Sequence, residues 1–284
     1  MDDVLYATDR FLLEPYLYSF IDSPLVQEPT LPRNIFGVWF ILSIGGILMY
    51  ISFAALSYLF IFDKSAEKDP LFLKNQVAKE IGLSLASIPF MGVLTTPIIL
   101  GEIYGYSKCY DNVEEYGLPF LILTIFTFLF FTDFGIYWIH RALHSRYLYF
   151  WCHKPHHWWK VPTPFASHAF HPVDGWAQSL PYHIYVFLFP THKWTYLALF
   201  VFVNFWTISI HDGDYRVPGF FRPILNGAAH HTDHHLLFNY NYGQFFTLWD
   251  RIGGSYKTPL VHESPEKQEE AKRKKAARKQ KKAE

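Results

Sequence analysis

Three short histidine-rich segments constrain this chain more than any other feature of its sequence. They read His-Arg-Ala-Leu-His from position 140, His-Lys-Pro-His-His from position 153 and His-Thr-Asp-His-His from position 231. Because residues three or four apart share one face of a helix, each segment aims two or three imidazoles at a common point. Neutral imidazole is the commonest metal ligand among side chains. The pattern therefore predicts a metal centre rich in nitrogen donors.

The remainder of the chain has the composition of a membrane protein. Half of its 284 residues are hydrophobic and 20% are aromatic. Four apolar stretches, 35–62, 81–100, 118–139 and 176–210, are as long as or longer than the roughly 20 residues that cross hydrocarbon. The fourth is interrupted at Pro190-Thr191-His192-Lys193, which favours a helical hairpin over a single span. We expect an all-α polytopic membrane protein whose helical cap on the cytosolic side holds a histidine-rich site for two metal ions.

Loop charge predicts the orientation of the spans. The loop at 63–80 carries four lysines, whereas the loop at 101–117 carries one. Lys and Arg gather on the cytosolic side of membrane proteins, so the first loop is expected in the cytosol and the second in the lumen. The third span then emerges into the cytosol at His140. All three histidine segments can share that side only if the stretch 176–210 enters and leaves by one face. Because the first span leads to the cytosolic loop at 63–80, the N-terminus is expected in the lumen.

The C-terminal end differs from the rest of the chain. We expect one domain over 1–262 and a basic cytosolic tail over 263–284, because residues 264–284 hold nine Lys or Arg against four Asp or Glu. Lys281 and Lys282 resemble a dilysine signal that returns membrane proteins to the endoplasmic reticulum. The chain has only two cysteines, Cys109 and Cys152, which excludes both a disulfide framework and a four-thiolate zinc site.

The number and type of ligands indicate which metal is bound. Eight imidazoles are twice what a structural zinc site needs and suffice for two ions with positions left open for dioxygen. Iron fits redox chemistry with such ligands, although zinc could occupy the same nitrogens in a purified sample. Nearby carboxylates are expected to orient the rings. Asp133 suits this role because it lies seven residues before His140 on the same helical face; the further candidates are Asp174, Asp212, Asp214 and Asp233.

These segments resemble the three histidine boxes of the membrane-bound fatty acid hydroxylase superfamily. Three other segments are similar to the sterol C5-desaturase (lathosterol oxidase) branch of that superfamily. They are Thr-Pro-Phe-Ala-Ser-His-Ala-Phe-His-Pro-Val-Asp-Gly from position 163, Trp-Thr-Ile-Ser-Ile-His-Asp-Gly-Asp from position 206, and Asn-Tyr-Gly-Gln-Phe-Phe-Thr-Leu-Trp-Asp-Arg-Ile-Gly-Gly from position 241. The resemblance extends from about residue 15 to residue 254 and leaves out the basic tail.

The resemblance implies an enzyme of sterol biosynthesis that introduces the C5(6) double bond into Δ7-sterols. It implies a non-haem di-iron cofactor, dioxygen, and electrons delivered from NADH through cytochrome b5 reductase and cytochrome b5. The expected location is the endoplasmic reticulum membrane, with the boxes and the C-terminus in the cytosol, and no nucleic acid is expected as a partner. The implied metal ligands are the eight box histidines, with two further candidates: His140, His144, His153, His156, His157, His231, His234 and His235, then His211 and His171.

The sequence also suggests where partners would bind. A sterol is nearly all hydrocarbon, so it is expected to enter an apolar cleft from the bilayer. Five tryptophans could line that cleft, although an interfacial aromatic belt accounts for the same residues: Trp138, Trp158, Trp159, Trp176 and Trp206. Three cations near the boxes could attract an acidic electron donor such as cytochrome b5: Arg146, Lys154 and Lys160.

Other functions fit parts of the pattern. A sterol C4-methyl oxidase or a fatty acid hydroxylase would share the boxes, so only the segments at 163 and 206 argue for desaturation. A membrane metal-ion transporter would place its ligands at the midplane of broken helices and often contains inverted repeats. Here the boxes flank the spans and no repeat is evident. A sterol-binding scaffold without activity would have no reason to keep every box histidine in register.

Overall fold

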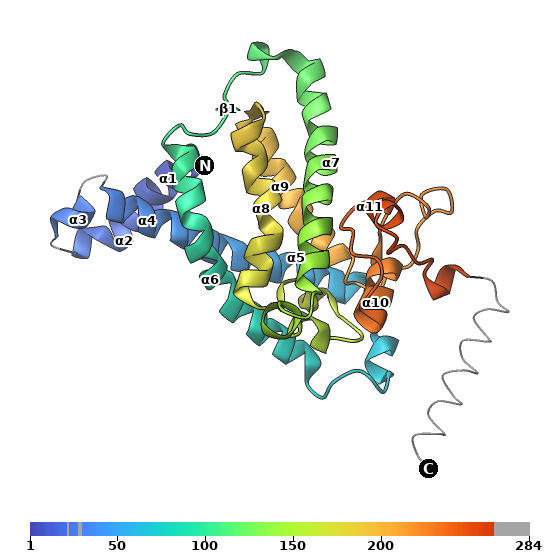
Figure 1. Ribbon diagram of the computed structural model, residues 1–284. Helices are drawn as coiled ribbons and strands as arrows, with labels where there is room; N and C mark the ends of the chain where they lie inside the picture. Colours follow the sequence, from blue (N-terminus) through green and yellow to red (C-terminus); the bar gives the residue numbers. More distant parts are fainter. Residues whose placement is uncertain (22, 28–29, 264–284) are drawn as a thin grey trace.

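The computed structural model describes residues 1–21, 23–27 and 30–263, so the predicted tail and its dilysine pair lie outside the described residues, apart from Glu263. The described part consists of helices and connecting loops with one parallel pair of two-residue strands, which confirms the all-α prediction (Figure 1). In chain order the α-helices and strands are α1 Asp2–Thr8, α2 Glu14–Tyr16, α3 Pro24–Gln27, α4 Leu31–Phe40, α5 Gly46–Phe60, α6 Gln76–Ile103, β1 Cys109–Tyr110, α7 Gly117–Leu143, α8 Pro172–Leu188, β2 Thr191–His192, α9 Lys193–Ser209, α10 Ala228–Leu237 and α11 Leu248–Ile252.

Three helical segments are long and apolar enough to cross a membrane: Leu31–Phe60, Gln76–Ile103 and Gly117–Leu143. They coincide with the predicted stretches 35–62, 81–100 and 118–139. The first consists of α4 and α5, which a π-helical turn at Ile41–Gly45 joins without a break. The second, α6, continues through two internal prolines, Pro89 and Pro97. Such prolines are tolerated in membrane helices because neighbouring groups satisfy the freed backbone.

The fourth apolar stretch is the predicted hairpin. Helices α8 and α9 have 17 residues each and are joined through β2, where the chain reverses near Pro190. Figure 1 shows the two helices side by side, next to α7. The core that holds α7, α8 and α9 together includes Phe128, Ile136, Val186 and Val203. The side chains of these residues are almost fully buried, so this packing fixes the relative position of the ends of all three helices.

Contacts at the two ends of α6 establish which loops share a side. Near the C-terminal end of α6, Glu102 accepts a hydrogen bond from the amino group of Met1 at 3.2 Å. At the N-terminal end, Gln76 donates from Nε2 to the carbonyl of Val161 at 2.8 Å. The chain terminus therefore lies at one end of the bundle and the loop that follows the second histidine box at the other. This agrees with the prediction that the N-terminus and the histidine boxes lie on opposite sides of the membrane. Which side is the cytosol and which the lumen stays a prediction.

The close approach of α7 to α8 depends on a glycine. A Cβ atom on Gly135 would lie 2.6 Å from Cγ of Pro181, well inside van der Waals contact. Gly135 lies just over one helical turn before His140, so the distance between the two helices also sets the position of the first box.

We expect Gly135→Ala to destabilise the protein by about 1–3 kcal/mol, because the added methyl group must displace α8. The matched control is Gly82→Ala in α6, where a Cβ meets no atom within 4 Å. Thermal unfolding of detergent-solubilised protein, followed by tryptophan fluorescence, measures both variants. A melting temperature that falls equally in the two variants would contradict the packing argument.

Candidate metal centre

The three boxes meet at one end of the helix bundle. His140 lies in the last turn of α7, and His144 caps that helix. The second box follows on two short helical turns, Tyr149–His153 and His156–Trp158. The third box lies on α10, and His211 follows directly after α9. Helical spacing of three or four residues turns the rings of each box towards the same interior space.

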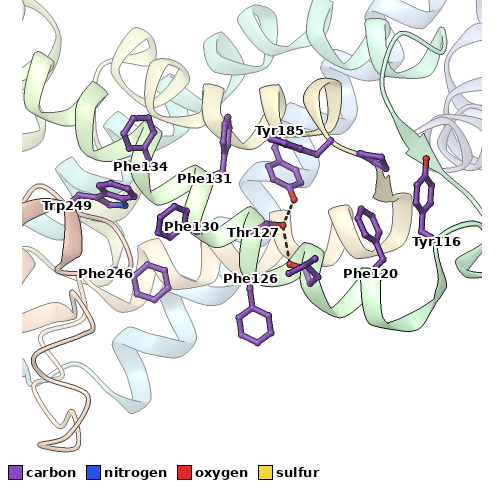
Figure 2. Close-up of a pocket in the computed structure, with 13 residues that line it drawn as sticks. Tyr116, Phe120, Phe126, Thr127, Phe130, Phe131, Phe134, Tyr185, Phe246 and Trp249 are labelled. Atoms are coloured by element: carbon purple, nitrogen blue, oxygen red, sulfur yellow. Dashed lines mark hydrogen bonds between the residues drawn. The ribbon is translucent and has the colours of Figure 1, made fainter. Parts of the chain in front are cut away.

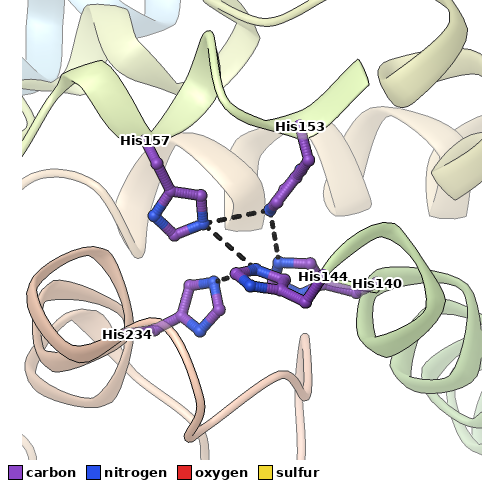
Figure 3. A group of neighbouring side chains, drawn as sticks. All are labelled: His140, His144, His153, His157 and His234. Atoms are coloured by element: carbon purple, nitrogen blue, oxygen red, sulfur yellow. Dashed lines mark hydrogen bonds between the residues drawn. The ribbon is translucent and has the colours of Figure 1, made fainter. Parts of the chain in front are cut away.

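Nine histidines form two groups, and the ligand atoms within each group lie within 4.8 Å of one another. The first group contains five residues, shown in Figure 3: His140, His144, His153, His157 and His234. The second contains four residues: His156, His211, His231 and His235. Eight of these nine are buried, and His144 is partly exposed. The groups adjoin, because the ring of His157 lies 4.9 Å from that of His235 between centroids.

Within the first group the rings converge through the same nitrogen. The Nε2 atom of His153 lies 3.1 Å from Nε2 of His140 and 3.1 Å from Nε2 of His157. The Nε2 atom of His144 lies 3.1 Å from that of His157 and 3.2 Å from that of His234. Figure 3 shows these nitrogens facing a common centre from three separate segments of backbone.

The second group has the same arrangement. The Nε2 atom of His231 lies 2.9 Å from Nε2 of His211 and 3.1 Å from Nε2 of His235. The ring of His156 packs edge-on against the ring of His235, with 4.6 Å between centroids. His156 and His157 are neighbours in the chain, yet they belong to different groups.

In several of these rings, a hydrogen bond on the opposite nitrogen shows that Nε2 carries a lone pair. The Nδ1 atoms of His140 and His234 lie 2.9 and 2.7 Å from the carbonyl oxygens of Tyr242 and Tyr240. A carbonyl oxygen only accepts, so each Nδ1 carries the proton and, in a neutral ring, each Nε2 carries a lone pair. His153 donates from Nδ1 to the carboxylate of Asp174 at 2.7 Å in the same way.

Opposed lone pairs repel unless a cation lies between them. The contact of 3.1 Å between Nε2 of His140 and Nε2 of His153 joins two rings whose Nδ1 atoms both donate elsewhere. Burial lowers the pKa of His234 to about 3 and that of His211 to about 4, so each ring stays neutral, with one proton, at neutral pH. The donor set therefore fits two metal ions that are held by neutral imidazoles.

The carboxylate that hydrogen-bonds a histidine ring of the two groups is Asp174, one of the further candidates from the sequence. Its Oδ2 atom accepts from His153, and its Oδ1 atom accepts from Gln178 at 2.7 Å. Both the aspartate and the histidine are fully buried. The first choice from the sequence, Asp133, was wrong: its carboxylate accepts backbone N–H groups of Gln244 and Phe245 at 3.0 and 2.7 Å.

Asp133 nevertheless supports the site indirectly. Together with Asp250 it anchors the loop at 241–247, since Asp250 accepts the backbone N–H groups of Tyr242 and Gly243, each at 2.8 Å. The carbonyl of Tyr242 is the acceptor that fixes the ring of His140. Asp250 and the two tyrosine carbonyls were not predicted from the sequence. The segment from position 241 was recognised by resemblance alone, and backbone acceptors leave no signal in residue types.

The remaining acidic candidates have other partners. Asp212 accepts the backbone N–H of Asp214 at 2.7 Å, and Asp214 forms an ion pair with Arg216 at 2.8 Å. Asp233 accepts the backbone N–H of Leu260 at 3.2 Å. These bonds shape the loops around the boxes.

His171 lies in neither histidine group. It is the N-cap residue of α8, and its Nδ1 atom accepts the backbone N–H of Val173 at 3.3 Å. By contrast, His211, the other candidate beyond the boxes, is brought into the second group. Its Nδ1 atom donates to the carbonyl of Thr207 at 2.7 Å, which turns Nε2 towards His231.

None of the five tryptophans proposed to line a cleft borders either of the following two hollows. A hollow of about 940 Å³ is an aromatic groove between α7 and α8 whose lining contains no histidine (Figure 2). A chamber of about 90 Å³ touches four of the nine histidines. Trp138 and Trp158 are about half exposed, which agrees with an interfacial belt. Trp159 and Trp206 instead donate to the carbonyls of Ala169 and Gln244.

Comparison with known proteins identifies the class of this fold and site. The model of the family described as fatty acid hydroxylase matches residues 125–255, which include all three boxes. The matched residues contain the nine histidines of the candidate metal centre. No solved structure matches the chain.

Within that class the chain belongs to the sterol 5(6)-desaturases. It is 55% identical to the lathosterol oxidase of Rattus norvegicus and 54% identical to that of Homo sapiens, in both cases over 93% of this chain and 87% of the relative. It is also 51% identical to the Δ7-sterol 5(6)-desaturase of Saccharomyces cerevisiae, over 89% of this chain and 69% of the relative.

Removing the charge of Asp174 is expected to weaken metal binding. Asp174→Asn keeps the shape of the side chain but removes the anion that holds His153, so we expect metal affinity to fall by about 10–100-fold. The control is Asp214→Asn, which removes a carboxylate whose partner, Arg216, lies at the surface. Competition with a chelator, followed by metal analysis of the protein, measures the affinity. Equal affinities in the two variants would show that Asp174 does not act on the centre.

Proposed function

We propose that this protein is a Δ7-sterol 5(6)-desaturase in which nine histidines hold two iron ions. The observation that carries the proposal is the pair of buried histidine groups in a chain more than half identical to two lathosterol oxidases. The reaction removes one hydrogen atom each from C5 and C6 of the sterol. These two hydrogens, with two electrons and two protons from a donor, reduce dioxygen to two molecules of water.

We assign each of the two histidine groups to one ion. Five imidazoles, those of the first group, would hold one ion, and the four of the second group would hold the other. His171 is left out because it caps α8. Neither cysteine belongs to these groups, and a donor set of imidazole nitrogens is compatible with iron. When bound, the ions supply the dioxygen chemistry that side chains lack.

The chain's own groups keep the rings ready for metal. The carbonyls of Tyr240 and Tyr242 and the carboxylate of Asp174 hold protons on Nδ1, so the metal-facing nitrogens stay unprotonated. Burial keeps water away from most of the ligands. A preorganised, dry site of this kind favours oxidation of the substrate over loss of reactive species to solvent.

We further propose that electrons come from NADH through cytochrome b5 and its reductase, in the endoplasmic reticulum membrane, with the boxes on the cytosolic side. Two of the three cations near the boxes support a docking face for an acidic donor. Arg146 is exposed and lies over the ring of Tyr147, and Lys154 lies over the ring of Phe150. Lys160 is already engaged, since its Nζ atom donates to the carbonyl of His235 at 3.3 Å.

The alternatives have less support. The relatives compared are named for oxidation or 5(6)-desaturation of sterols, and not for methyl oxidation or fatty acid hydroxylation, although the family model carries the hydroxylase name. A metal-ion transporter is disfavoured because the histidine groups lie at one end of the bundle, beyond the middle of every span.

We expect His156→Ala and His234→Ala each to abolish formation of the 5,7-diene while the protein still inserts into membranes. The first change removes a ligand from the four-histidine group and the second from the five-histidine group. Sterol analysis of a host that lacks C5-desaturase, together with iron per chain in anaerobically purified protein, measures the effect. His171→Ala is the control and should retain iron and turnover. Diene formation in both ligand variants would refute the assignment.

Reversing the charges near the boxes tests the electron donor. We expect the double variant Arg146→Glu, Lys154→Glu to slow reduction by cytochrome b5 by about tenfold or more at low salt, because charge complementarity mainly accelerates association. Lys108→Glu, at the opposite end of the bundle, is the control. Stopped-flow reduction at several salt concentrations measures the rates. A rate unaffected by the double change would argue against this docking face.

A further inference from the structure

Two hollows meet beside the histidines. The chamber of about 90 Å³ reaches His140, His156, His211 and His231. A second cavity, of about 280 Å³, lies among α5, α6, α8 and α9, and its lining is mostly apolar. The two hollows adjoin, because the same five residues line both: Met91, His168, Ser179, Tyr182 and Asn204.

One face of α9 runs along both hollows. Leu197 and Val201 line the apolar cavity, Asn204 lies at the junction, and Thr207 and His211 line the chamber. These residues are three or four apart, so they share a helical face. At about 1.5 Å per residue the face is roughly 20 Å long. Along it the side chains change from hydrocarbon through amide and hydroxyl to imidazole.

The polar groups at the junction are arranged as a unit. His168 and Asn204 share a hydrogen bond of 3.2 Å between Nε2 and Oδ1. Nδ1 of His168 also contacts the hydroxyl of Ser167 at 3.1 Å. Ser179 lies beside them on α8 and lines both hollows. The chamber and the apolar cavity together form one continuous path. This path has a polar inner end, at the chamber, and an apolar outer end.

We propose that the Δ7-sterol occupies this path with its 3-hydroxyl leading, so that ring A lies in the chamber and the side chain in the apolar cavity. The inference rests on the proposed function. C5 is two bonds from the carbon that bears the hydroxyl, so the reacting carbons and the hydroxyl must lie near the metals together. His168 and Asn204 are positioning residues for the hydroxyl. A hydrocarbon tail in the chamber would face side chains that are mostly polar and could make no hydrogen bond with them, whereas a hydroxyl could.

The depth of the cavity in the membrane supports the same orientation. Its lining residues Leu42, Met49 and Ile88 come from the middle of two spans, whereas His140 lies at the end of a third. A sterol in a bilayer keeps its hydroxyl at the surface and its tail at the midplane, because a polar group in hydrocarbon is unfavourable. The substrate can therefore move sideways from the leaflet into the path without turning over.

The larger groove is excluded although its volume would hold a sterol. Its lining contains none of the nine histidines. Its two inner hydroxyls, on Thr127 and Tyr185, are bonded to each other at 2.6 Å (Figure 2). The volume of a hollow alone is therefore a poor guide to the sterol site, because the larger groove does not reach the histidines.

The test compares one blocking substitution in each hollow, in iron-loaded, full-length protein in liposomes. Leu197→Trp fills the apolar cavity, and Leu123→Trp fills the aromatic groove by the same change. The probe is a Δ7-sterol with a diazirine on its side chain. We expect Leu197→Trp to lose photolabelling and to raise KM by about tenfold or more while iron per chain is unchanged. Leu123→Trp should behave as the unmodified protein, whose label should map to α5 and α9.

The outcomes separate the two proposals. Loss of labelling in Leu123→Trp but not in Leu197→Trp would overturn the assignment of the path. A label in the unmodified protein next to His168 would reverse the orientation. If unmodified protein with two irons formed no diene, the proposed function itself would fail. Should Leu197→Trp contain little iron, Met49→Trp closes the same cavity from α5 and takes its place.

Discussion

The candidate metal centre depends on hydrogen bonds that Nδ1 donates. In each ring that makes such a bond, it leaves Nε2 without a proton and free to bind a cation. Where a carbonyl or carboxylate accepts from Nδ1, as at His140, His153 and His211, Nε2 is left with a lone pair that points inward. Two such lone pairs, those of His140 and His153, whose Nε2 atoms lie 3.1 Å apart, would push the rings apart, so the fold has to hold them against that repulsion. The packed ends of α7 and α9 provide this restraint, and a bound cation would turn the repulsion into attraction.

The two carboxylates that hold the loop at 241–247 connect the stability of the membrane bundle with the shape of the site. Asp133 is fully buried within a span, where an isolated charge is expensive, and it is satisfied by backbone N–H groups from the segment after the third box. Asp250 holds the same segment from its other end. A change in either carboxylate would alter the carbonyl that faces His140 without touching any ligand.

Much of this architecture could be predicted, because long apolar runs and helical histidine spacing are local signals. The interruption at Pro190 predicted the hairpin for the same reason. The role of Asp133 could not be predicted, since periodicity identifies the face of a helix but not the segment that packs against it. His171 carried a signal that was missed: a polar residue followed by proline is typical of the start of a helix, and His171 caps α8. The division into five and four histidines depends on tertiary packing alone.

Adjacent ligands in the chain serve different groups, and this has a mechanical consequence. His156 and His157 share one short helical turn, while α10 contributes His234 to one group and His231 and His235 to the other. Any shift of that turn or of α10 on release of one ion is transmitted directly to the ligands of its neighbour. The two histidine groups are therefore mechanically coupled, and two ions held by them would not bind independently of each other.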